Sequence, residues 1–82
     1  MNKEYILYNL KEGLNQLTET IKELESDSEY EFGDYIVDMT HLYHHINTAW
    51  NAKNSTKLEV DKCSENDFRT WRNFPKDIEM SD

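Results

Sequence analysis

The sequence predicts an all-α fold, in which an antiparallel helical hairpin is followed by a short C-terminal helix. Two segments predict the hairpin, because their apolar residues recur at alternating intervals of three and four. A short polar stretch joins these segments, and a small aromatic segment follows near the C-terminus. At 82 residues the chain forms one domain at most.

The first helix is predicted by a seam of six aliphatic side chains, Leu7, Leu10, Leu14, Leu17, Ile21 and Leu24. Their spacing follows one side of a helix and excludes the alternation of a strand. Gly13 interrupts a run of good helix formers and would cost about 1 kcal/mol relative to alanine at an exposed position. It either lets another backbone come close or is a tolerated weakness.

The second helix is predicted by a second seam, Phe32, Ile36, Met39, Tyr43, Ile46 and Trp50. The stretch SDSEYEFGD, residues 26–34, precedes most of it and is rich in turn formers and acids. Two helices of similar length with a short link form an antiparallel hairpin, here over residues 4–53. We expect the two seams to pack against each other.

Further apolar residues, Ile6, Tyr35 and Leu42, widen the stripe beyond a two-helix seam. Either a second copy covers its outer side, giving a homodimeric four-helix bundle, or the C-terminal third folds back. The hairpin pattern resembles that of the small RNA-binding plasmid regulators whose hairpins pair into such a bundle. The resemblance concerns architecture and implies no RNA binding here.

The rest of the chain is predicted as three pieces. Residues 54–63 lose the 3–4 spacing and are expected to form a connector. Residues 64–75 are expected to form a short docking helix, which starts at a capping-box-like Ser64 and is ended by Pro75. Residues 76–82 are expected to fray.

Composition narrows the class of partner. The chain has 17 acidic and 9 basic residues and a net charge of -8, which disfavours nucleic-acid binding. No segment approaches the ~20 apolar residues of a membrane span, and the N-terminus lacks the apolar run of a signal peptide. With its single cysteine, Cys63, the chain is expected in the cytoplasm. Six acids between Glu23 and Asp34 form a solvated turn, a docking patch for a basic partner, or a nucleic-acid mimic.

Two polar stripes on the second helix are candidate sites. Asp38, His41 and His45 lie within about 40° of Asp34, on the side opposite the seam, where they could contact a metal. No further ligand is obvious, so we expect ordinary acid–base pairs and no cofactor. Thr40, His44, Asn47 and Asn51 border the seam, as do Asn9, Gly13, Gln16 and Thr20 on the first helix. Such uncharged polar rows either suit a helix–helix interface or are polar residues that the boundary of a core tolerates.

The sequence favours a non-catalytic protein–protein interaction module over an enzyme. No Ser or Cys nucleophile lies near His44 in sequence, and the chain has no glycine loop for phosphate. The hypothesis is a homodimer that docks an unidentified protein, with anchors of the types that dominate interfaces: Trp50, Phe68, Trp71 and Arg72. The alternatives are an acidic nucleic-acid mimic that inhibits a basic protein, and a weak metal-binding module that uses His41 and His45.

Overall fold

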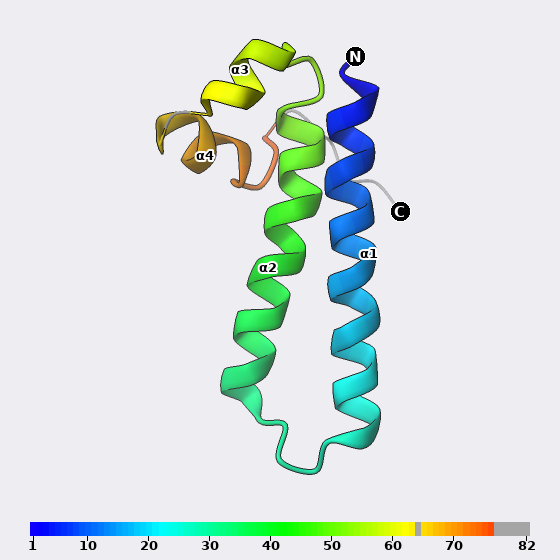
Figure 1. The fold of residues 1–82 in the computed structure, drawn as a ribbon. Coiled ribbons are helices and arrows are strands. Elements are labelled where there is room, and N and C mark those ends of the chain that lie inside the picture. The colour runs from blue at the N-terminus through cyan, green and yellow to red at the C-terminus, as the bar shows by residue number, and fades with distance from the viewer. Residues whose placement is uncertain (64, 77–82) are drawn as a thin grey trace.

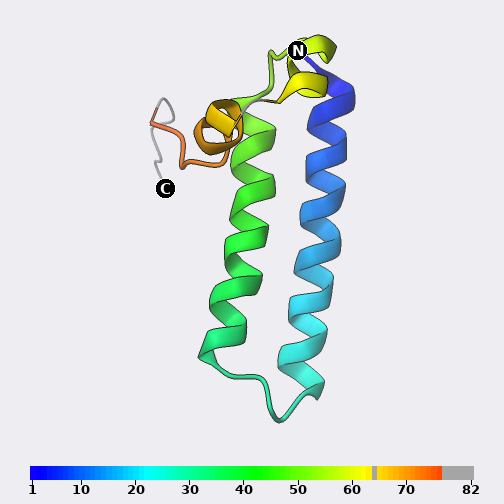
Figure 2. The same ribbon diagram turned by 60° about the vertical axis from the view of Figure 1, so that its left-hand side comes forward.

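The computed structural model describes residues 1–63 and 65–76, without the side chains of Glu65, Asn66 and Phe68. In this part of the chain no strand forms, and the helices are α1 (Lys3–Ser26), α2 (Phe32–Asn51), α3 (Lys57–Lys62) and α4 (Glu65–Trp71). α1 and α2 lie side by side and antiparallel, whereas α3 and α4 lie at the end of the hairpin away from its turn (Figures 1 and 2). The prediction of an all-helical hairpin is confirmed.

The open end of the hairpin is closed by Asn2. Its side-chain oxygen accepts a hydrogen bond from the Tyr5 N–H at 3.1 Å and thereby caps α1. Its backbone N–H donates to the Lys53 carbonyl at 2.6 Å, and its amide donates to the Ser55 carbonyl at 2.9 Å. One residue thus both starts α1 and holds it beside the end of α2.

The turn between α1 and α2 is stabilised by its acidic side chains. The Asp27 carboxylate accepts from the Glu29 N–H at 2.9 Å, and the Asp34 carboxylate accepts from the Glu31 N–H at 3.0 Å. Acidic groups suit this place because the N-terminus of α2 carries positive partial charge. Part of the acidic run therefore shapes the turn, and so short a link holds the helices antiparallel.

The contact between α1 and α2 is not centred on the predicted seams, whose side chains are mostly exposed, although Ile46 Cγ1 would lie 3.9 Å from a Cβ built on Gly13. α1 instead contributes a small and polar row, in which Asn9, Gly13 and Thr20 are buried. A Cβ built on Gly13 would lie 3.8 Å from Leu42 Cδ1 and from His45 Cβ. Small side chains let two helix backbones approach closely, which the leucine seam would prevent.

The row of α2 predicted to face water, Asp34, Asp38, His41 and His45, does so only in part. Asp38 and His45 are half-buried against α1, while His41 is exposed. His45 Nδ1 lies 3.4 Å from Asn9 Oδ1 across the hairpin, and the Tyr30 hydroxyl donates to Asp38 at 2.8 Å. Asp34 and His41 face water as predicted, whereas α1 partly covers the side of α2 that carries Asp38 and His45.

The predicted connector, residues 54–63, is partly helical because it contains α3. Thr56 caps this helix by accepting from the Glu59 N–H at 3.1 Å, and the Glu59 carboxylate accepts from the Thr56 N–H at 3.0 Å. These hydrogen bonds, with the Thr56 backbone first, hold the pKa of the Glu59 carboxyl below its usual value. A reciprocal cap is what allows so short a helix to form here.

The C-terminal segment packs on its own hairpin. Trp71 is 8% exposed, and its ring centroid lies 6.1 Å from that of Tyr5 in an edge-on contact. The predicted docking helix 64–75 is observed as α4, which ends four residues before Pro75. Ser64, expected to cap it, and residues 77–82 of the predicted frayed tail lie outside the described residues.

Candidate interaction surface

The predicted seams form an exposed surface, here called the apolar face. Eleven of its twelve side chains expose between 36% and 74% of their area, and Met39 is half-buried. Its members are Leu7, Leu10, Leu14, Leu17, Ile21 and Leu24 of α1 with Phe32, Ile36, Met39, Tyr43, Ile46 and Trp50 of α2. The hydrophobic stripe that sequence reasoning placed inside the hairpin therefore lies on its surface.

Both seams lie on the same side of the hairpin. On each helix the seam is about 110° from the residues that contact the other helix, counting 100° per residue. Viewed along each chain, both seams are rotated in the same sense from the residues that contact the other helix. Because the two helices run in opposite directions, this rotation brings both seams to the same side of the hairpin. The groove described below confirms this, since Leu10 of α1 and Ile46 of α2 both line it.

The two seams are also in register. The hydrogen bond between Asn2 and Lys53 places these two residues at the same height along the hairpin, at its open end. Further along, Gly13 lies beside Leu42 and Ile46. Each following residue rises about 1.5 Å along its helix. The face therefore consists of layers with one residue of each helix: Leu7 with Trp50, Leu10 with Ile46, Leu14 with Tyr43, Leu17 with Met39, Ile21 with Ile36, and Leu24 with Phe32.

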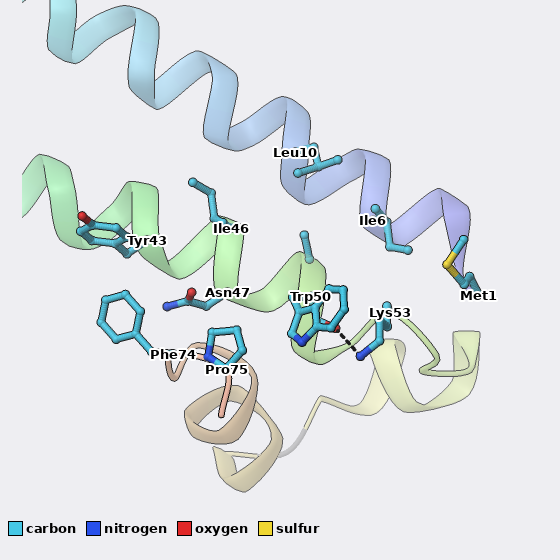
Figure 3. Close-up of a pocket in the computed structure, with 11 residues that line it drawn as sticks. Met1, Ile6, Leu10, Tyr43, Ile46, Asn47, Trp50, Lys53, Phe74 and Pro75 are labelled. Carbon is cyan, nitrogen blue, oxygen red and sulfur yellow. Dashed lines mark hydrogen bonds between the residues drawn. The ribbon is translucent and has the colours of Figure 1, made fainter. Parts of the chain in front are cut away.

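An apolar groove of about 660 Å³ opens at the Trp50 end of the face (Figure 3). The segment after α4 forms its outer wall, where the Phe74 ring meets the Tyr43 ring edge-on at 5.2 Å between centroids. Lys53 closes one side, with its ammonium 4.0 Å from the Trp50 ring centroid and 3.3 Å from the Trp50 carbonyl. Sequence reasoning missed Phe74 as part of any site, although an aromatic residue directly before a helix-ending proline was a signal for it.

Two asparagines of the predicted polar row hold the C-terminal segment in place. The Asn51 amide donates to the Trp71 and Asn73 carbonyls at 2.7 and 2.6 Å, and the Asn47 amide donates to the Arg72 carbonyl at 2.9 Å. These carbonyls lack partners within α4 because they lie at or beyond its C-terminus. The asparagines thus position the groove wall instead of contacting α1.

The other two members of that row lie elsewhere. Thr40 is exposed, and its hydroxyl donates to the Ile36 carbonyl within α2 at 2.7 Å. His44 lines a small cavity of about 190 Å³, on the far side of the hairpin, with Cys63. Burial lowers the pKa of the His44 imidazole, and the charges of His45 and Arg72 add to this effect. The cavity brings together a histidine and a cysteine that are distant in sequence.

The predicted contact anchors are divided among different surroundings. Trp71 is buried within its own chain and is therefore not available as an anchor. Trp50 lies on the apolar face, and Arg72 is exposed beside the groove wall. The Phe68 side chain lies outside the described residues.

The acidic and histidine residues do not converge on a cation site within the described part of the chain. There, no three His, Cys, Asp or Glu side chains form a group that could hold a metal ion. Across the hairpin, desolvation raises the pKa of the Glu23 carboxyl, and its hydrogen bond with Asp38 raises it further. Asp38 is thus engaged with Glu23 and Tyr30, while His41 points to solvent.

Comparison with protein-family models, curated proteins and solved structures finds no match to this chain. Among the described residues, no helix has the length and apolar character to span a bilayer. The apolar face and its groove are therefore the features on which a functional interpretation depends.

Proposed function

We propose that this chain is a non-catalytic protein–protein interaction module and that the apolar face is its working surface. Two copies would pack face to face and form a four-helix bundle. The observation that carries the proposal is the apolar face itself, which continues over six layers of large hydrophobic side chains. Exposed apolar patches of this extent mark interaction surfaces in soluble proteins.

The area of the face suits a stable interface. With eleven of its side chains 36–74% exposed, the face offers on the order of 1,000 Å² per chain, and a standard interface buries about 800 Å² per partner. The hydrophobic residues buried inside the described part of a single chain are few: Leu42, Ala49, Ala52 and Trp71. A small domain with so little core gains much of its stability from a partner.

The chemistry of the face also supports a binding role. Its members are aliphatic or aromatic, and a phenol is their sole titratable group. Such side chains pack and exclude water but do not transfer protons or attack substrates. We propose the cytoplasm as the compartment, because the single cysteine requires no oxidising environment.

Sedimentation equilibrium at micromolar concentration tests the assembly. The expected mass is twice the 9.9 kDa of one chain. Leu14→Glu would place a charge at the centre of the face and is expected to return the mass to that of one chain. The matched control is Val37→Glu, which changes a side chain of similar exposure on the opposite side of α2. A wild-type mass of one chain would refute the proposal.

A different protein that presents two amphipathic helices would use the same face. Capture from the native host with wild-type chain, Leu14→Glu and Val37→Glu as baits tests this role. A partner that binds through the face is retained by the Val37→Glu bait and lost from the Leu14→Glu bait. A partner held by the acidic turn, as the nucleic-acid mimic hypothesis requires, would instead bind all three baits and leave as salt increases.

A further inference from the structure

We propose that the second copy lies antiparallel on the apolar face and inserts its Phe32 into the groove beside Trp50. This inference rests on the proposed function, since it specifies how two copies meet. It assigns an occupant to the groove and a role to Phe32, which at 74% exposure is the most exposed member of the face.

Symmetry leaves two ways to pack one face on another. A two-fold axis along the helices puts both turns at one end, and a two-fold axis across them puts the turns at opposite ends. In the second arrangement α2 packs against α2 of the other copy, in the opposite direction. The layer of Trp50 then lies opposite the layer of Phe32, because they are the first and last layers of the face.

Charge favours the antiparallel arrangement. Residues 19–38, around the turn, carry eight acidic side chains and one lysine, a net charge of -7. Residues 53–82, the part of the chain that follows the hairpin, carry six basic and seven acidic side chains, a net charge of -1. A parallel pair would bring the two acidic turns together, whereas an antiparallel pair keeps them apart and so avoids their repulsion.

The groove has the character that an aromatic side chain requires. Trp50, Tyr43 and Phe74 line it with rings, and Ile46 and Pro75 contribute aliphatic surface. Its volume of about 660 Å³ leaves room between the hairpin and the segment after α4 (Figure 3). Phe32 starts α2, and a Cβ built on the following Gly33 meets nothing within 4 Å, so the approach to Phe32 is open.

Spin-label distances distinguish the two arrangements. The reporter is Glu29→Cys at the exposed turn, in a chain whose own cysteine is removed by Cys63→Ser. The antiparallel pair separates the labels by at least about 36 Å, the length of the 24-residue α1. A parallel pair holds them within about 25 Å, because neighbouring helices of a bundle lie 8–10 Å apart.

A long distance supports the inference. A short distance overturns the antiparallel arrangement and leaves the proposed assembly intact, whereas the absence of any coupling between labels at micromolar concentration overturns both. The role of Phe32 is tested separately by Phe32→Ala, with Val37→Ala as the matched control. Because each pair loses two aromatic side chains, Phe32→Ala is expected to weaken self-association on the order of 100-fold. Equal dissociation constants for the two variants would overturn that role.

Discussion

Replacing Gly13 by alanine is expected to stabilise the hairpin. Gly13 is buried against α2, yet a Cβ at this position would meet its nearest neighbours, Leu42 Cδ1 and His45 Cβ, at 3.8 Å, an ordinary van der Waals distance. The methyl group therefore fits without displacing either helix. Alanine also relieves the helix-interior penalty of glycine.

The magnitude follows from two contributions. Glycine in a helix interior costs about 0.5–1 kcal/mol relative to alanine. Burial of one added carbon contributes up to about 0.8 kcal/mol. The expected gain in the free energy of unfolding is therefore between about 0.5 and 2 kcal/mol. At about 4–8 °C per kcal/mol for a domain of this size, the melting temperature rises by several degrees.

Urea unfolding followed by far-UV circular dichroism measures this gain. Wild type and variant are compared at one protein concentration, because self-association would make the midpoint depend on concentration. The matched control is Gly33→Ala, where no atom lies within 4 Å of the built Cβ. Only the conformational contribution applies there, so the gain is expected to be smaller. A lower midpoint for Gly13→Ala than for wild type would refute the reasoning, since it would mean that the helices approach too closely for any side chain.

Three further predictions concern the rest of the fold. Asn51→Ala removes the amide that holds the Trp71 and Asn73 carbonyls, and it is expected to lower the free energy of unfolding by about 2 kcal/mol. Urea unfolding measures this loss, with Asn54→Ala at an exposed position as the control. Equal losses for the two variants would contradict the prediction. Because burial lowers the pKa of His44, the unfolded chain binds more protons below the ordinary value of 6.5. The contribution of His44 to the free energy of unfolding is therefore fully present above pH 6.5 and decreases on acidification. His44→Gln is expected to flatten this fall, and identical pH profiles would contradict the assignment. Zinc titration of a chain with His41 and His45 both replaced by alanine is expected to match wild type; a loss of affinity would revive the metal hypothesis.

The sequence by itself determined the two long helices and their stripes. Alternating intervals of three and four placed the seam residues on one side of each helix, and the acidic turn formers between them required an antiparallel return. It also identified the second row of α1, with Asn9, Gly13 and Thr20, as suited to a helix interface. These properties are local, because a helix repeats its geometry along a single segment.

The tertiary structure decided which stripe meets which surface. Each helix carries a leucine-type seam and a small or polar row with the same rhythm, and periodicity alone cannot rank them as contacts for the neighbouring helix. The small side chains packed beside Leu42 and the hydrogen bonds of Asn2 hold the small row of α1 in the hairpin and turn the seam outward. The docking of Asn51 and Phe74 depended on carbonyls and rings that meet only after the chain has folded back. Contacts between segments distant in the chain created the groove, and no local pattern contained it.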